Sequence, residues 1–249
     1  MGDGGYTYTP PTTPYTVPPI LTTIWGQEAP FNLKCPIENK QRTKAGCVAI
    51  AIGQVVAHFE KGDFPSGYNY DWDIIKSVGR MQDWVVISDN KMRYDAYQEN
   101  EVSMFIKEIG GMCCMNYDDE VSTSLPWKIS NCLRELGYSE INFYWGYDIG
   151  DVTTSLLRGI PVFVSASHYL KGHTWVIDGF DGFAVDDESD SLVHCNWGWD
   201  GVYNGFYYSG VFDLSNGAVI TDGDYGDVDV SGSDRRYDIM FSTVLIEQI

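Results

Sequence analysis

The stretch from residue 44 to residue 60 constrains this chain most, because it predicts an apolar helix that begins at a cysteine. Its sequence is KAGCVAIAIGQVVAHFE, in which a turn of small residues, Ala45 and Gly46, leads to Cys47. The first N–H groups of a helix are unpaired and carry partial positive charge. Both properties favour a thiolate, the nucleophilic form of cysteine. The stretch therefore predicts a nucleophile at Cys47, although a free cysteine is more often a small buried apolar residue.

The composition is typical of a globular chain, and its charge argues against binding to polyanions. With 249 residues, of which 44% are hydrophobic, we expect one large domain or two closely packed subdomains. The net charge of −19 argues against nucleic-acid binding and against docking on anionic lipid through a basic patch. No stretch approaches the length of a membrane-spanning helix. High solubility is the safest consequence of this charge.

The cysteines do not indicate a metal or redox motif. The chain has six cysteines and no C-x-x-C pair, which disfavours a zinc ribbon. Cys113 and Cys114 are adjacent, and the others are scattered. The even number leaves disulfide pairing open.

The chain divides into a lead-in and two parts of different character. Residues 1–20 contain five prolines and predict an extended lead-in or a remnant of a propeptide. Residues 21–249 then form a single domain. We expect a helical subdomain over about 21–137 and a β subdomain over about 138–249.

The patterns in the two parts predict an α+β fold. An apolar stripe at Val102, Phe105, Ile106 and Ile109 predicts a helix over 98–109 that ends at Gly110-Gly111. Further helices are expected at 127–136 and 151–158. Stretches rich in β-branched and aromatic residues predict strands at 141–147, 161–167, 173–180, 192–198, 205–210 and 237–247. Helices followed by antiparallel strands indicate an α+β architecture with a cleft where the two parts meet.

A cysteine nucleophile needs a base, and His173 is the best of four histidines. His58 lies too far along the helix of Cys47 to touch it, and a histidine in its last turn is favoured by the helix dipole. His168 lies in a loop, and His194 faces the opposite side of its strand from Cys195. His173 opens the strand HTWVIDG and shares a face with Trp175. A satisfied core histidine is the competing interpretation.

The next strand carries a candidate partner for His173. It ends in Asn196, Trp197, Gly198 and Trp199. The Asn196 side chain could accept a hydrogen bond from the far nitrogen of His173, as in Cys–His–Asn sites, with Trp197 or Trp199 covering that bond. Asp178 is a rival, but strand alternation turns it away from His173. A turn with core aromatics would explain the same residues.

The remaining requirement is a donor for the oxyanion. Gln27 lies upstream in the loop WGQEAPFN, and its side-chain amide could act with the backbone N–H of Cys47. Alone, a glutamine in such a loop is simply solvated. Gly46 and Gly172 directly precede Cys47 and His173, and we expect them to line the substrate site.

These residues resemble a known family. The blocks WGQEAPFN, AGCVAIAIGQV, YNYDWD, GHTWVIDGF and HCNWGWDGVYNGF, in this order between about residues 24 and 210, resemble the streptopain family of bacterial cysteine peptidases. The 126 positions between Cys47 and His173 are close to the papain-like spacing. The resemblance implies a papain-like fold and endopeptidase activity.

The resemblance also assigns roles. It implies Cys47 as nucleophile, His173 as general base and acid, Gln27 as oxyanion donor and Asn196 as the group that orients His173, with Trp197 packed over that contact. It further implies a secreted or cell-surface bacterial enzyme that is made as a zymogen, with protein or peptide substrates and with its own propeptide or a protein inhibitor as partners. We expect no cofactor.

The chain departs from the family in two places. Residues 115–122 replace a glycine-rich segment, and residues 211–236 contain an acidic stretch, Asp213 to Asp234, in place of a glycine-rich loop. Both segments border the cleft in the family, so they leave substrate preference open.

Three other functions fit part of the pattern. The first is a catalytically silent papain-like binding module, and the second is a Cys–His amidase or transglutaminase-like enzyme. The third is a Ca²⁺ site at Asp222, Asp224, Asp227 and Asp229, whose spacing fails the EF-hand pattern because Asp227 stands where glycine is required. A solvated acidic loop explains these residues better, and we expect no metal site.

Overall fold

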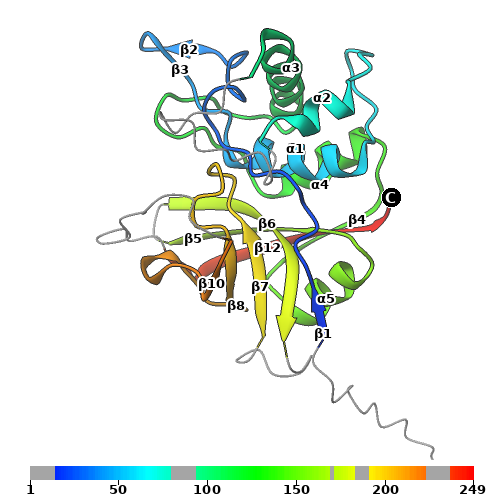
Figure 1. The fold of residues 1–249 in the computed structure, drawn as a ribbon, viewed down its shortest axis with the longest axis vertical. Coiled ribbons are helices and arrows are strands. Elements are labelled where there is room, and N and C mark those ends of the chain that lie inside the picture. Colours follow the sequence, from blue (N-terminus) through cyan, green and yellow to red (C-terminus); the bar gives the residue numbers. More distant parts are fainter. Residues whose placement is uncertain (1–14, 80–93, 169–170, 183–190, 223–235) are drawn as a thin grey trace, which may run out of the picture.

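The computed structural model describes residues 15–79, 94–168, 171–182, 191–222 and 236–249. Two layers are visible in Figure 1, with helices α1 to α4 above and a twisted sheet with helix α5 below. The helices are α1 Cys47–Phe59, α2 Trp72–Ser77, α3 Ala96–Met112, α4 Trp127–Glu135, α5 Ile149–Leu157 and the 3₁₀ turn η2 Leu214–Asn216. This arrangement confirms the predicted α+β class.

The strands form one large antiparallel sheet. Its order is β10-β8-β7-β6-β5-β12-β4, with β1 paired to β6 outside this path. The members are β1 Tyr15–Val17, β4 Ser139–Trp145, β5 Val162–His168, β6 Lys171–Gly182, β7 Leu192–Asn196, β8 Gly205–Tyr208, β10 Ile220–Thr221 and β12 Ile239–Gln248. Two small hairpin-like pairs lie outside it, β2 Ile37–Glu38 with β3 Gln41–Arg42 and β9 Phe212–Asp213 with β11 Arg236–Tyr237. All six predicted strand regions are present.

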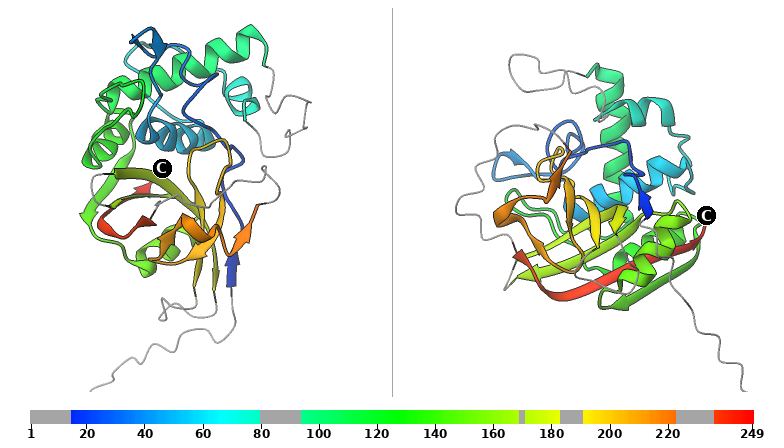
Figure 2. Two further views of the ribbon diagram at one scale, coloured as in Figure 1. Left: turned by 90° about the vertical axis from the view of Figure 1, so that its left-hand side faces the viewer. Right: turned by 60° about the horizontal axis from the view of Figure 1, so that its bottom comes forward.

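Strand β6 is the centre of the sheet because it pairs with three strands. On one edge it pairs with β7, and on the other it pairs with β5 up to Ile177 and then with β1 from Phe180. Part of the proline-rich lead-in, 15–17, is therefore a strand of the sheet, whereas 1–14 lies outside the described residues. Figure 2 shows β1 beside the end of β6 that is remote from the helical layer.

Both faces of the sheet are buried. Val176 and Phe163 pack into the core of the helical layer, whereas Trp175 and Ile177 pack into a second core with α5. Because successive side chains of β6 point to opposite faces of the sheet, this strand contributes residues to both cores. This result confirms that Trp175 and Ile177 share a face that Val176 does not.

Helix α3 runs past the two glycines at which we expected it to end, and it finishes at Met112. Gly110 is needed for close approach rather than for termination. A Cβ there would lie 2.0 Å from the hydroxyl oxygen of Tyr117. A capping box of Asp95 and Gln98 starts the helix.

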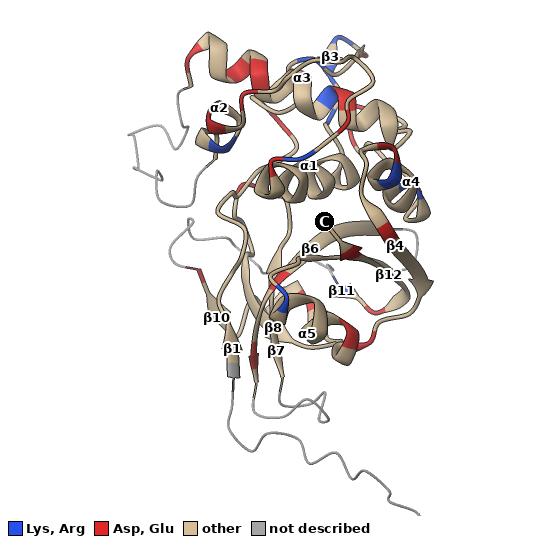
Figure 3. Ribbon diagram, turned by 90° about the vertical axis from the view of Figure 1, so that its right-hand side faces the viewer, with Lys and Arg blue, Asp and Glu red and all other residues tan. Residues whose placement is uncertain are grey.

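Acidic residues occur on both layers, as Figure 3 shows. Over the whole sequence 35 Asp and Glu residues face 16 Lys and Arg residues. No described helix is long and apolar enough to cross a membrane.

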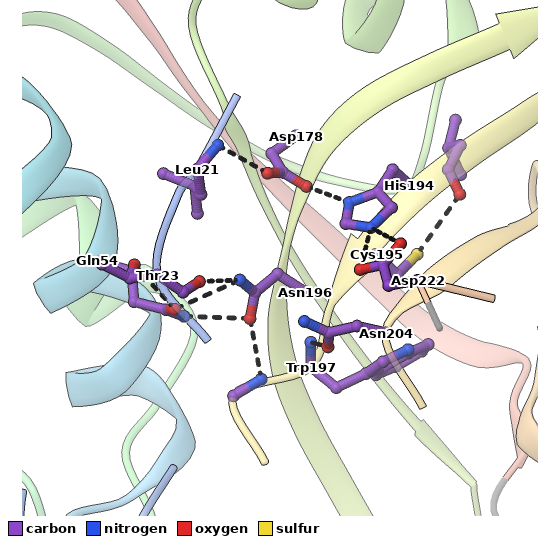
Figure 4. A network of polar contacts seen from close by, with 12 residues as sticks. Leu21, Thr23, Gln54, Asp178, His194, Cys195, Asn196, Trp197, Asn204 and Asp222 are labelled. Atoms are coloured by element: carbon purple, nitrogen blue, oxygen red, sulfur yellow. Dashed lines mark hydrogen bonds and ion pairs between the residues drawn. The ribbon is translucent and has the colours of Figure 1, made fainter. Parts of the chain in front are cut away.

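A buried charged network ties the N-terminal segment to the sheet (Figure 4). His194 Nδ1 lies 2.5 Å from Asp178 Oδ1, and its Nε2 lies 2.9 Å from Asp222 Oδ2. The second oxygen of Asp178 accepts a hydrogen bond from the backbone N–H of Leu21 at 2.8 Å. Burial alone would lower the pKa of His194, but Asp178 and Asp222 raise it to about 10. An imidazolium at this position donates to both carboxylates.

The first prediction concerns this network. Because folding raises the pKa of His194 from 6.5 to about 10, its stabilisation is complete below pH 6.5 and is lost as the pH rises towards 10. His194→Gln should therefore lower the free energy of unfolding at pH 6, and its difference from wild type should shrink by up to about 1.4 kcal/mol per pH unit above that. Urea unfolding between pH 6 and 9 measures both values.

The control for this prediction is His168→Gln, because His168 makes a more exposed pair with Asp238. Its difference from wild type should stay small. A constant difference between wild type and His194→Gln over the whole pH range would contradict the assignment of a charged His194.

The second prediction compares two helical glycines. A Cβ at Gly53 in α1 would lie 2.6 Å from Ile106 Cδ1 and 3.1 Å from Trp25 Cζ3, whereas no described atom lies within 4 Å of that position at Gly111 in α3. Gly53→Ala should destabilise the protein by about 1–3 kcal/mol through overpacking. Gly111→Ala should stabilise it by up to about 1 kcal/mol through helix propensity. Denaturant midpoints measure the change in stability for each variant. Changes of the same sign in both variants would refute the packing argument.

Candidate active site

Cys47 is the first residue of α1, as the sequence predicted. Gly46 precedes it with φ of +91°, a conformation that favours glycine. A Cβ at Gly46 would also lie 2.0 Å from Met115 Cε and 3.3 Å from the Ser122 Cβ. The turn into α1 therefore requires glycine for two independent reasons. It leaves Cys47 half-buried at the start of the helix.

The environment of Cys47 raises the pKa of its thiol. Burial is the largest cause, and hydrogen bonds from Thr174 and from the backbone of Val48 and Cys47 oppose it. The backbone N–H groups at the helix start do favour the thiolate, as expected, but burial outweighs them. A thiolate here needs a further positive charge.

The contact with Thr174 places Cys47 against the strand that carries His173. Thr174 follows His173 on β6, and both are buried. The backbone and the side chain of Thr174 both interact with the Cys47 sulfur. Helix α1 crosses directly above β6 in Figure 1, which brings two segments together that lie far apart in the sequence.

His173 is held by a backbone carbonyl. Its Nε2 lies 2.8 Å from the carbonyl oxygen of Trp197, and its ring is 6% exposed. A carbonyl oxygen only accepts hydrogen bonds, so Nε2 carries the hydrogen. In a neutral imidazole, Nδ1 is then the basic nitrogen. This arrangement fixes one tautomer of His173.

Aromatic rings surround His173, although the bond to Asn196 that we expected Trp197 or Trp199 to cover is absent from the described structure. The Trp199 ring lies 4.2 Å from the His173 ring, and the Trp197 ring lies 6.0 Å from it. Tyr237, which the sequence interpretation missed, contributes a third ring at 5.7 Å. Trp197 is fully buried, whereas Trp199 is partly exposed. These rings keep water away from the bond between Nε2 and the Trp197 carbonyl.

The predicted bond between the Asn196 side chain and His173 is not formed in the described structure. Asn196 Nδ2 donates to the Thr23 carbonyl at 2.8 Å and to Gln54 Oε1 at 3.2 Å. Its Oδ1 accepts from Gln54 Nε2 at 3.2 Å and from the Gly198 N–H at 3.3 Å. None of these partners is His173. The acceptor for His173 is one residue further along the chain, on the backbone of Trp197.

Gln27 lies beside the turn that delivers Cys47. Its carbonyl oxygen accepts a hydrogen bond from the Ala45 N–H at 2.9 Å, two residues before Cys47. Its side chain is half-buried, and no hydrogen bond of that amide is recorded among the described residues. Next to it, the Asp200 carboxylate occupies the space that a Cβ of Gly26 would need. Gly26 therefore allows the loop after β7 to close on the Gln27 segment.

The two glycines expected to line the substrate site, Gly46 and Gly172, differ in exposure. Gly172 is exposed at the start of β6, with the Ala166 carbonyl oxygen 3.8 Å from its Cβ position. Gly46 is buried against Met115 and Ser122, so the reason for glycine there is conformational. Met115 and Ser122 belong to the segment 115–122, which we expected to border the cleft, and this segment lies against Gly46.

Asp178, the rival partner for His173, and Asp222, one of the four residues of the metal hypothesis, both bind other groups. Asp178 binds His194 and the Leu21 N–H, which confirms that it is turned away from His173. Asp222 also binds His194, while Asp224, Asp227 and Asp229 lie outside the described residues. The described part of the chain contains no cluster of three His, Cys, Asp or Glu residues that could hold a metal ion.

A surface cavity of about 660 Å³ lies elsewhere and contains none of the candidate residues. It is lined by Tyr68, Tyr70, Met104, Lys107 and Glu108, with Lys34, Ser66 and Gly67. A large pocket is the default place for a ligand, but this one holds no nucleophile next to a base. The chemistry therefore points to Cys47.

Comparisons with known proteins identify the family of this chain. The family model described as "Peptidase C10 family" matches residues 25–207. The thiol protease/hemagglutinin PrtT of Porphyromonas gingivalis is 26% identical over 239 residues, which are 85% of this chain and 27% of that protein. Streptopain of Streptococcus pyogenes is 23% identical over 221 residues, which are 74% of this chain and 52% of that protein. The chain thus spans about a quarter to a half of these relatives.

Solved structures show the same fold. The active wild-type interpain A cysteine protease of Prevotella intermedia matches with a TM-score of 0.68 and 23% identity, covering 92% of this chain and 94% of that one. A prointerpain A fragment matches with a TM-score of 0.65 and 24% identity, covering 92% and 71%. The papain-like fold expected from the sequence is confirmed. Because the family model covers most of the chain and contains Cys47, His173 and their surroundings, this protein belongs to the peptidase C10 family of streptopain-like proteins.

Proposed function

We propose that this chain is a cysteine endopeptidase that hydrolyses peptide bonds in proteins through a thioester acyl-enzyme. The observation that carries the proposal is the placement of Cys47 at the start of α1 against Thr174, the residue next to His173. His173 in turn has its Nε2 hydrogen held by the Trp197 carbonyl, which leaves Nδ1 for proton transfer. Nucleophile, base and base-holding group therefore come from three adjacent elements.

In the proposed reaction, Nδ1 of His173 takes the proton of the Cys47 thiol. The resulting thiolate attacks the scissile carbonyl, and its charge is balanced by the imidazolium. Because burial disfavours an isolated thiolate at Cys47, this ion pair supplies the positive charge that the helix terminus does not. His173 then gives its proton to the leaving amine and activates the water that releases the acyl group.

The tetrahedral intermediate carries a negatively charged oxygen that needs donors. We assign this role to the Gln27 side-chain amide and the Cys47 N–H. The bond between the Gln27 carbonyl and the Ala45 N–H fixes Gln27 beside the nucleophile. Gly172, exposed at the start of β6, is the proposed contact for the substrate backbone.

The biological setting follows from the resemblance. We propose a secreted or cell-surface bacterial enzyme that is made as a zymogen and is inhibited by its own propeptide. The relation to a prointerpain A fragment supports this proposal. Protein substrates are expected, and the segment 115–122 beside Gly46 is a candidate for their selection.

The third prediction tests the nucleophile. Cys47→Ala should abolish casein hydrolysis and leave the fold intact, because a methyl group cannot form the acyl-enzyme. In the wild-type protein, an epoxysuccinyl peptide should label Cys47, as read by peptide mass spectrometry. The control is Cys114→Ala, which removes an exposed cysteine and should keep full activity.

Two outcomes would refute the third prediction. Wild-type casein hydrolysis by Cys47→Ala would place the nucleophile elsewhere. A folded wild-type protein with no adduct at Cys47 and no hydrolysis would instead indicate a silent binding module.

The fourth prediction tests the ion pair. In His173→Gln, the pKa of the Cys47 thiol should lie above its ordinary value of 9.0, because burial is no longer offset by an imidazolium. Its alkylation by iodoacetamide should therefore be slow at pH 6–7 and rise steeply above pH 9. The wild-type protein should react at pH 6–7 already. Site-resolved mass spectrometry separates Cys47 from Cys114, and identical profiles for the two proteins would refute the pair.

A further inference from the structure

Gln54 is the one strongly polar residue inside an otherwise apolar stretch of α1. It lies seven residues after Cys47, on the same face of the helix, and is 1% exposed. A buried amide without partners costs about 1–3 kcal/mol. Its presence in the centre of the molecule therefore requires a full set of hydrogen bonds, and the structure shows where they go.

The Gln54 amide binds two other segments of the chain (Figure 4). Its Oε1 accepts from the Thr23 hydroxyl and from the Trp25 N–H, both at 3.1 Å. It also forms a reciprocal pair with the side-chain amide of Asn196, with both bonds at 3.2 Å. Thr23 and Trp25 lead directly to Gln27, and Asn196 ends β7. One side chain thus joins the Cys47 helix to the segments that carry the other candidate residues.

Asn196 passes this constraint to His173 through one peptide unit. Its Oδ1 accepts from the Gly198 N–H, and that N–H belongs to the same peptide unit as the Trp197 carbonyl. The Trp197 carbonyl accepts from His173 Nε2 at 2.8 Å. The unit is therefore held at its N–H by Asn196 and presents its oxygen to His173. Gly198 allows the close approach of α1, since its Cβ would lie 3.1 Å from Ile50 Cγ2.

We propose that Gln54 is a positioning residue for the proposed peptidase reaction, which fixes His173 relative to Cys47 through Asn196 and the Trp197–Gly198 peptide unit. The inference rests on the proposed function. Because Gln54 and Cys47 belong to one helix, a displacement of that helix would move the nucleophile and the support of the base together. The simpler alternative is that Gln54 only stabilises the contact between the two layers.

The fifth prediction separates these alternatives with Gln54→Met, which keeps the length of the side chain and removes its hydrogen bonds. We expect kcat to fall by about 10- to 100-fold, as for a slightly misplaced catalytic group, with KM changed by less than about twofold. The matched control is Thr153→Val. Thr153 is a buried polar residue in α5, on the far side of the sheet, that bonds within its own helix. This control should retain wild-type kcat.

A second measurement does not depend on peptidase activity. In the Cys47→Ala background, NMR titration reports the pKa of His173 directly. The Trp197 carbonyl stabilises the imidazolium by a charge-assisted bond, so a looser carbonyl should lower this pKa by about half a unit or more. Should Gln54→Met not fold, Gln54→Asn, whose amide is too short to reach Asn196, is expected to shift the titration in the same direction.

Two results would overturn the inference. One is a folded Gln54 variant in which His173 titrates as in the parent protein. The other is a loss of kcat that Thr153→Val reproduces, since it would reflect stability alone. If the wild-type protein were inactive, the proposed peptidase function would be wrong. The NMR titration of His173 could still be measured and would test the positioning by Gln54 separately.

Discussion

The packing of α1 between the other helices of its layer and the sheet is the constraint on which the rest of the structure depends. Ten of its thirteen residues are buried, and its neighbours include Val176 and Phe163 of the sheet. An apolar helix of this kind has no stable position at the surface. Once it is buried against β6, Cys47 lies beside Thr174, which is the residue next to His173 on that strand.

The thiolate form of Cys47 is disfavoured unless His173 supplies a positive charge. Burial disfavours the charged thiolate at Cys47, and the N–H groups at the helix start recover only part of this cost. At His194 the same burial is overcome, because two carboxylates face one imidazole. The difference lies in the number of charged partners. A buried charge at Cys47 is thus conditional on His173, whereas the one at His194 is permanent at neutral pH.

Much of the fold could be predicted from the sequence, because local patterns determine it. The strand regions, the Cys47 helix and the common face of Trp175 and Ile177 all follow from periodicity. The acceptor for His173 could not be predicted, since a backbone carbonyl has no signature in the sequence. Gln54 did have a signature in the sequence, because it is a lone amide in an apolar helix. Its role, however, depends on contacts with Thr23 and Asn196 that only the structure shows. The need for glycine at Gly110 in α3 depends likewise on the close approach of Tyr117.

The pairing of β1 with the far end of β6 has a practical consequence. His173 lies near one end of β6 and Gly182 at the other, and nine residues of strand span about 30 Å. Tyr15 therefore lies on the side of the molecule opposite to the cysteine. A segment attached there must run back over about the same length before it reaches the cysteine, so a short surface linker next to Tyr15 leaves the approach of a large substrate open.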